Sequence, residues 1–185
     1  MLLDNVKTPA DVKKLNIKEL QTLADEIRER IIGVVNKNGG HLASNLGVAE
    51  IIVALYYCFD FPKDKLIFDV GHQCYAHKIL SDRNDRFDTI RRENGLSGFP
   101  DPSESVYDAF VAGHAGNSIS ACLGYCSARD TLKEDYYVID VVGDASLFNG
   151  ENLEAATTNE KKPKKFIIIL NDNGMSISKN NNALY

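Results

Sequence analysis

Residues 143–178 read GDASLFNGENLEAATTNEKKPKKFIIILNDNGMSIS, and they follow the apolar run YYVIDVV at residues 136–142. This run is rich in β-branched and aromatic side chains, which is typical of a strand buried on both faces. A turn at Gly143-Asp144, helix-favouring residues at 152–158, the polar breaker KKPKK and a second apolar run, FIIIL at 166–170, follow in that order. The order predicts one βαβ unit of a parallel sheet, with its second strand also buried.

The predicted βαβ unit also indicates where a ligand would bind. Because parallel strands joined by a crossover helix end at the same edge of a sheet, Asp144 and Asn173 should lie close together there. A carboxylate, an amide oxygen and a backbone carbonyl after Asn173 form a partial oxygen shell that suits Mg²⁺ when a diphosphate supplies the other oxygens. The alternative is that Asp144 only caps the next helix and Asn173 only makes a turn.

Three of the four histidines suggest a site for proton transfer. His41, His72 and His114 each follow a glycine, and glycine lets a ligand approach the backbone closely. Histidine is suited to moving protons near neutral pH. The simpler interpretation is a surface or hydrogen-bonding role, which we assign to His77. A zinc site is disfavoured because no Cys/His pair has the spacing of a structural zinc site.

Several motifs taken together resemble one family. Gly143-Asp144 followed by Asn173 after the next strand looks like the thiamine-diphosphate motif, although the usual pattern is GDG. The stretches GGHLASNLG, DVGHQCYAHKIL, GLSGFP and NDNGMSIS are similar to those of the 1-deoxy-D-xylulose-5-phosphate synthases. The resemblance extends over the whole chain. It implies an α/β fold of three layers, αβα, with a mostly parallel sheet: the thiamine-diphosphate-binding fold, incomplete in this chain.

The resemblance implies a role for each matching residue. His41 matches a histidine that acts on protons of the substrate and the intermediate, and His72 matches one near the thiazolium and the diphosphate. His114 matches a cofactor contact. The other implied cofactor contacts are Gly113, Ala115, Asp144, Ala145, Ser146 and Asn173. The implied Mg²⁺ ligands are the side chains of Asp144 and Asn173 and the carbonyl of Met175.

At four positions the chain departs from the family's pattern. The family usually has a hydroxyl residue in place of Ala115, often Ser or Thr in place of Gly116, glycine in place of Ala145 and commonly glutamate in place of Gly174. None of these changes removes a metal ligand. We therefore expect them to alter cofactor affinity more than the chemistry, and Ala145 to be tolerated if its φ is negative.

The family performs a transferase reaction that joins pyruvate and glyceraldehyde 3-phosphate into 1-deoxy-D-xylulose 5-phosphate and CO₂, for isoprenoid, thiamine and pyridoxal biosynthesis. The implied cofactors are thiamine diphosphate and Mg²⁺. Residues 1–185 match the N-terminal part of the diphosphate- and magnesium-binding domain, without the pyrimidine-binding and C-terminal domains. We expect the chain to be inactive alone, and to form a homodimer or to need a complementary chain with the missing domains. We also expect an uncovered strand edge or sheet face.

Two alternatives stay open. The chain could be a non-catalytic remnant or the cofactor-binding subunit of a split enzyme. It could also be a transketolase or a relative of the two-subunit 2-oxo-acid dehydrogenases, which share the fold and the metal site.

Composition limits the possible partners. The chain has 185 residues, 44% of them hydrophobic and 25% charged, with a formal net charge of −5. This acidic balance argues against nucleic acid as a partner. We find no apolar run of the roughly 18 residues that a membrane span needs, and we expect a cytoplasmic protein. The four cysteines, with no C-x-x-C pair, predict small buried core residues.

Periodicity predicts the remaining elements. Asn16 and Glu19 form a capping-box-like start to a helix that ends at Asn38-Gly39-Gly40. We predict further helices at residues 48–57, 78–92 and 117–129, a strand at 65–70 and a loop at 94–105.

Overall fold

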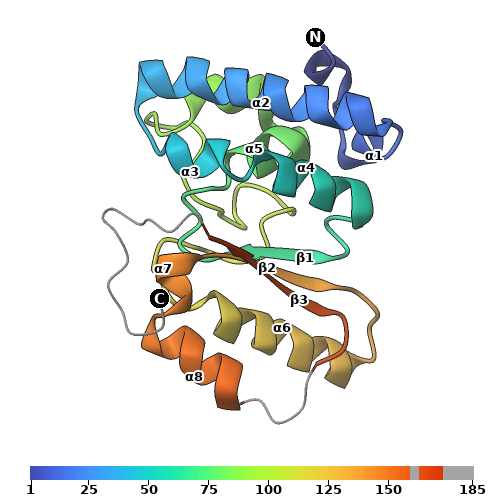
Figure 1. Cartoon of the computed structure of the whole chain (residues 1–185), viewed down its shortest axis with the longest axis vertical. Coiled ribbons are helices and arrows are strands. Elements are labelled where there is room, and N and C mark those ends of the chain that lie inside the picture. Colours follow the sequence, from blue (N-terminus) through green and yellow to red (C-terminus); the bar gives the residue numbers. More distant parts are fainter. Residues whose placement is uncertain (159–162, 173–185) are drawn as a thin grey trace. The chain divides into compact units, whose positions relative to one another are not determined.

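The structure, a computed structural model, describes residues 1–158 and 163–172. It divides into two compact units, and Figure 1 labels the elements of each. The first unit contains Met1–Pro62 and His72–Val111, and the second contains Lys63–Gly71 and Ala112–Tyr185.

The first unit is helical. Its elements are η1 (Leu3–Asn5), α1 (Pro9–Val12), α2 (Ile17–Asn38), α3 (Ala43–Leu46), α4 (Ala49–Cys58), α5 (Tyr75–Lys78), η2 (Ile79–Arg83) and η3 (Asn84–Thr89). The predicted cap of α2 is confirmed, because the Asn16 side chain accepts hydrogen bonds from the N–H groups of Lys18 and Glu19 at 3.0 and 3.1 Å. Gly39 ends α2 with φ +74°, a conformation that favours glycine.

The core of this unit forms where α2 packs against α4. Residues at helical spacing on α2 are fully buried, namely Leu23, Ile27, Ile31 and Val34, and α4 buries Ile52 and Tyr56. Both helices therefore follow the predicted apolar periodicity. A free thiol departs from the prediction: Cys58, the last residue of α4, is exposed, whereas Cys74, Cys122 and Cys126 are buried.

The predicted helix at residues 78–92 is wrong. The segment contains a π-type turn, in which Ser81 and Asp82 have non-helical backbone angles, and then the 3₁₀ helix η3. A regular helix of 3.6 residues per turn would direct His77, Lys78 and Arg83 to three different sides. In the fold all three reach the same buried carboxylate, Asp108, which requires the kink.

The second unit contains a parallel three-stranded sheet in the order β1-β2-β3. Its strands are β1 (Lys65–Phe68), β2 (Val138–Gly143) and β3 (Phe166–Asn171), and its helices are α6 (Ser118–Leu132), α7 (Asp144–Leu147) and α8 (Gly150–Thr158). Helix α6 packs against all three strands and against α8, and in Figure 1 α6 and α8 lie on one side of the sheet while α7 lies at the end of its strands. The predicted α/β class, parallel sheet and βαβ unit are confirmed.

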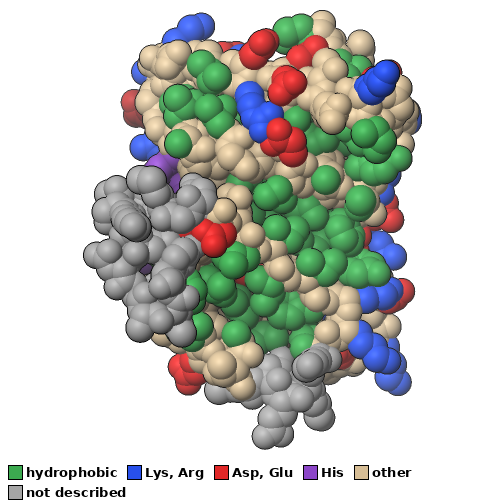
Figure 2. All heavy atoms as spheres, viewed as in Figure 1, with side chains coloured by type: hydrophobic (Ala, Val, Ile, Leu, Met, Phe, Trp, Pro, Cys, Tyr) green, Lys and Arg blue, Asp and Glu red, His purple; other side chains and the backbone are tan. Residues whose placement is uncertain are grey.

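The predicted burial of the FIIIL run is wrong. Among the described residues β3 pairs only with β2, and Ile168 and Leu170 are 40% and 44% exposed. In Figure 2 hydrophobic side chains gather where β3 runs in Figure 1. Apolar content alone predicts a buried strand, but here β3 is an edge strand whose alternate residues face outward. The result agrees with the expected uncovered sheet face.

In the part of the chain that the structure describes, no helix is long and apolar enough to cross a membrane.

Candidate functional site

Two of the predicted histidines lie together in the first unit. The rings of His41 and His72 have their centroids 5.1 Å apart in an edge-to-face arrangement, and the ring of Phe99 lies 6.1 Å from that of His41. His41 is exposed and His72 is half-buried, so His41 can meet a ligand from solvent. This arrangement is compatible with the roles that the resemblance implies for the two histidines, which stay predictions.

A buried asparagine ties the two histidine segments together. The Asn45 side chain, fully buried at the third position of α3, donates to the carbonyls of His41 and His72 at 2.6 and 2.8 Å. Its Oδ1 accepts a hydrogen bond from the N–H of Tyr75 at 2.8 Å. The Asn45 amide thus reaches backbone groups of two residues, His72 and Tyr75, that lie 27 and 30 positions after it in the chain. Asn45 was not among the residues predicted from the sequence.

We predict that Asn45→Ala destabilises the first unit and separates the two histidines. The substitution leaves two carbonyls and one N–H without their partner, which we expect to lower the free energy of unfolding by about 2–3 kcal/mol. Urea unfolding measures the loss, and a histidine-ring NMR spectrum reports the separation. Ser44→Ala, the preceding residue of α3, is the control and should change neither. Equal spectra for the two variants would contradict this role of Asn45.

Close packing explains the glycine before His41. Gly40 has φ +137°, and a Cβ at this position would lie 2.6 Å from the hydroxyl of Tyr75, so only glycine fits. Partial burial and the nearby Arg91 cation lower the pKa of His41. A neutral His41 can accept a proton at neutral pH. Arg91 could not be found from the sequence, because no spacing rule connects it to a histidine fifty positions before it.

The fourth histidine is buried, as a structural role requires. His77 is fully buried. Its Nδ1 lies 2.8 Å from the hydroxyl of Tyr56, and its Nε2 lies 2.8 Å from Asp108 Oδ1. Burial lowers the pKa of His77 despite the carboxylate beside it. The neutral ring therefore donates from Nε2 to Asp108 and accepts at Nδ1 from Tyr56.

Three of the predicted metal and diphosphate residues, Asp144, Ala145 and Ser146, lie in the described part of the second unit. Asp144 is buried and begins α7 directly after β2, at the carboxyl edge of the sheet. The register pairs Gly143 with Asn171, so Asp144 and Asp172 follow neighbouring strands at the same level, as predicted for the two ends of the βαβ unit. Ala145 lies within α7 and is not among the residues with positive φ, so its methyl group is tolerated there.

The predicted cofactor loop at residues 113–116 precedes α6 in the same unit. Gly113 and Gly116 have φ +147° and +91°, and His114 and Ala115 are exposed. A Cβ at Gly116 would collide with the side chain of Asn149. Glycine at this position, where the family often has Ser or Thr, therefore fits the close approach of Asn149.

Two predicted ligands, Asn173 and Met175, lie outside the described residues. Among the described residues no group of three or more His, Cys, Asp or Glu side chains could hold a metal ion. The implied set requires only one such side chain, that of Asp144, with an amide and a carbonyl as its other members. The donor chemistry of Asp144 fits a hard cation.

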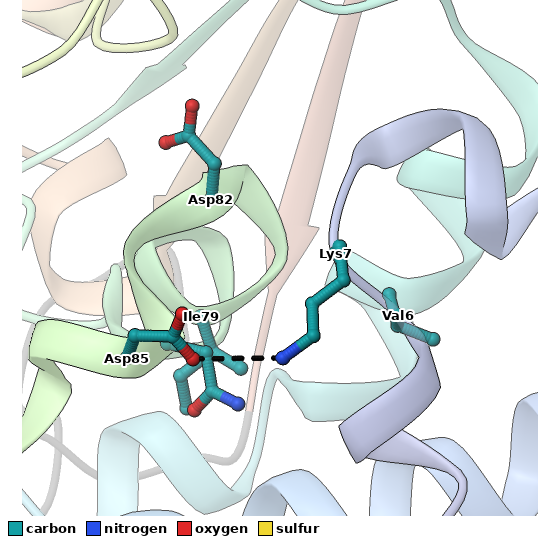
Figure 3. Close-up of a pocket in the computed structure, with 6 residues that line it drawn as sticks. Val6, Lys7, Ile79, Asp82 and Asp85 are labelled. Atoms are coloured by element: carbon teal, nitrogen blue, oxygen red, sulfur yellow. Dashed lines mark ion pairs between the residues drawn. The ribbon is translucent and has the colours of Figure 1, made fainter.

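A recess in the first unit contains none of the predicted site residues. It is lined by Val6, Lys7, Ile79, Asp82, Asn84 and Asp85. Figure 3 shows Lys7 reaching Asp85, and their charged groups are 3.6 Å apart. Both side chains are more than half exposed, so this pair contributes little to stability.

The sequence profile of the family described as 1-deoxy-D-xylulose-5-phosphate synthase matches residues 3–185. The chain belongs to this family. It is 51% identical over 184 residues to the 1-deoxy-D-xylulose-5-phosphate synthase of Thermus thermophilus, and 53% identical over 183 residues to that of a Dehalococcoides mccartyi strain. These alignments cover 100% and 99% of this chain but only 30% and 29% of the two relatives.

Solved structures with a similar fold include two transketolases. The transketolase from Leishmania mexicana matches 85% of this chain and 28% of its own, with a TM-score of 0.78 and 20% identity. A transketolase variant from Pichia stipitis matches with a TM-score of 0.75 and 21% identity. The predicted transketolase-like fold is confirmed by these likenesses.

Proposed function

We propose that this chain supplies the diphosphate- and magnesium-binding part of a thiamine-diphosphate-dependent transferase that makes 1-deoxy-D-xylulose 5-phosphate from pyruvate and glyceraldehyde 3-phosphate, with release of CO₂. Membership of the synthase family carries the proposal. Because the chain spans about 30% of the length of the curated relatives, the remaining domains come from further sequence or from a second chain. We further propose, from the family alone, a cytoplasmic protein that works as a dimer.

Within this function the residues of the second unit hold the anionic end of the cofactor. Asp144, with Asn173 and the carbonyl of Met175, would bind Mg²⁺, and the backbone at Ala145 and Ser146 would line the diphosphate. Gly113, His114 and Ala115 would contact the cofactor from the loop before α6. Thiamine diphosphate, when bound, supplies the carbanion chemistry that the side chains of the protein lack.

The residues of the first unit act on protons. His41, whose pKa is lowered by burial and by Arg91, is suited to accept a proton at its ring nitrogen and to return it. His72, 5.1 Å away, would support the same centre. Asn45 keeps both backbones in place.

A transketolase activity is the second candidate, and identity argues against it. The chain is 51–53% identical to the synthases and only 20–21% identical to the two transketolases. A non-catalytic remnant or a cofactor-binding subunit is distinguished by experiment. In an enzyme that contains this chain, one assay would measure the formation of 1-deoxy-D-xylulose 5-phosphate, and a second would measure ketol transfer between sugar phosphates. The comparison separates synthase activity from transketolase activity.

Titration calorimetry of thiamine diphosphate into this chain, with and without Mg²⁺, tests the proposal. We expect binding that requires Mg²⁺ and that Asp144→Ala abolishes, because the substitution removes the one carboxylate ligand. Asp135→Ala, which removes an exposed carboxylate of the same unit, is the matched control and should bind as the unchanged chain does. Binding that is independent of both Mg²⁺ and Asp144 would contradict the assigned ligand set.

A further inference from the structure

The carboxylate of Asp69 organises the loop at residues 113–116. Asp69 follows β1 and is 1% exposed. Its oxygens accept hydrogen bonds from the N–H of Gly116 at 2.9 and 3.1 Å and from the N–H of Ser118 at 3.2 Å. The acceptor therefore fixes both the last residue of the loop and the start of α6, from a position 47 residues earlier in the chain.

Asn152 extends this arrangement to helix α7, which begins at Asp144. Fully buried in α8, Asn152 donates from Nδ2 to Asp69 Oδ2 and to the carbonyl of Ser146, both at 3.0 Å. Its Oδ1 accepts a hydrogen bond from the N–H of Ile119 at 3.2 Å. Both hydrogens and the oxygen of one amide are thus committed to three different segments.

The backbone around this pair is held in unusual conformations. Val70, immediately after Asp69, has φ +58°, which is strained for a β-branched residue. Gly116 has φ +91°, and it has no room for a Cβ against Asn149. Such conformations persist only where the surroundings over-determine them. The buried hydrogen bonds of Asp69 and Asn152 provide that constraint on the backbone at Val70 and Gly116.

We propose that Asp69 and Asn152 are a pair of positioning residues that hold the loop at 113–116 and helix α7 (Asp144–Leu147) in one fixed arrangement. The proposal rests on the proposed function, because these two segments carry the residues assigned to the cofactor. Neither side chain touches the cofactor in this assignment. Their effect is to preorganise the backbone that does, so that less order is lost on binding.

Asn152→Leu tests the pair, because leucine is similar in size and favours a helix but makes no hydrogen bonds. Without the cofactor, we expect amide exchange at Gly116, Ser118 and Ile119 to become at least about tenfold faster. Ile119 loses its acceptor directly, whereas Gly116 and Ser118 keep Asp69 as their acceptor but lose the amide that holds Asp69 in place. Exchange at the β2 amides should stay unchanged. With Mg²⁺, the affinity for thiamine diphosphate should fall by about tenfold or more.

Thr157→Ala is the matched control, since Thr157 is an exposed residue of α8 whose hydroxyl, among the described residues, bonds to carbonyls of its own helix. Asn152→Ala serves as a second variant should the leucine not fit. Exchange at Gly116 that stays as slow as in the control overturns the proposal, and so does unchanged affinity. If the unchanged chain itself does not bind the cofactor, the proposed function fails for this chain, and the exchange data alone decide the role of the pair.

Discussion

Asp108→Asn is expected to lower the free energy of unfolding by about 3–5 kcal/mol, because it removes the anion from a buried cluster of cations. Asp108 is 3% exposed, and its carboxylate accepts hydrogen bonds from both terminal nitrogens of Arg83 at 2.7 and 2.8 Å. It also accepts from His77 and from the N–H of Asp101, each at 2.8 Å. Burial by itself would raise the pKa of Asp108, but the hydrogen bonds from Arg83 and His77 hold it well below its usual range.

The neutral replacement cannot satisfy these donors. An asparagine would direct an NH₂ group toward groups that themselves donate. Among the described residues it would leave the buried Arg83 and Lys78 with Glu104 as their one carboxylate partner. The cluster also connects the kinked segment at 75–89 with the loop that contains Phe99, the residue beside His41. We therefore expect the histidine pair to become disordered together with the fold of this unit.

Thermal and urea unfolding measure the effect of Asp108→Asn, with an expected loss of about 10 °C in the melting temperature. Asp88→Asn is the matched control in the same unit. Asp88 forms a two-point ion pair with Arg30, but its side chain is 60% exposed, so its loss should cost less than about 1 kcal/mol. Equal destabilisation by the two substitutions would refute the special role of the buried cluster.

Local sequence signals predict the regular elements of this chain well. The Asn16 cap, the apolar period of α2 and the strand that ends at Gly143 are each encoded within a few neighbouring residues, and the structure has all three. The irregular segment after Tyr75 could not be predicted this way. Its conformation depends on Asp108 and Glu104, which are far from it along the chain and become partners only in the fold.

The same distinction applies to the candidate site. Motif positions such as His41, His72 and Asp144 could be found because each stands at a turn beside glycine or at the end of a strand. Asn45 and Asn152 could not, since an asparagine in a short polar turn or within a helical pattern looks like any exposed polar residue. Their importance follows from burial and from hydrogen bonds to distant backbone, which only the fold reveals.

Asp140 should make the stability of the second unit strongly dependent on pH. This carboxyl lies at the centre of β2, where the register places it between Ile67 and Ile168, and it is fully buried. Ser118 donates to its Oδ2 at 3.0 Å, and its Oδ1 has no hydrogen-bond partner among the described residues. Burial, with a smaller effect from the charge of Asp69, raises the pKa of Asp140 to about 7.

The direction of the effect follows from where the proton is held. Below about pH 4 the carboxyl is protonated in both the folded and the unfolded chain, and the folded state carries no penalty. Between about pH 4 and pH 7 the unfolded chain releases the proton while the folded chain retains it, so stability falls as the pH rises. The integrated loss is on the order of 4 kcal/mol, and it is complete above pH 7, where the buried carboxylate is charged.

Asp140→Asn removes this titration while keeping the shape of the side chain and an acceptor for Ser118. We therefore expect the free energy of unfolding of the variant, relative to that of the unchanged chain, to increase by roughly 4 kcal/mol between pH 4 and pH 8. Urea unfolding across that range measures this difference. The difference between the two curves is informative because all other titrating groups contribute to both. Asp130→Asn, an exposed carboxylate at the end of α6, should give a curve parallel to that of the unchanged chain. A parallel curve for Asp140→Asn would instead mean that the folded chain provides Asp140 with a solvated or paired environment, because only a carboxylate with such an environment keeps an ordinary pKa.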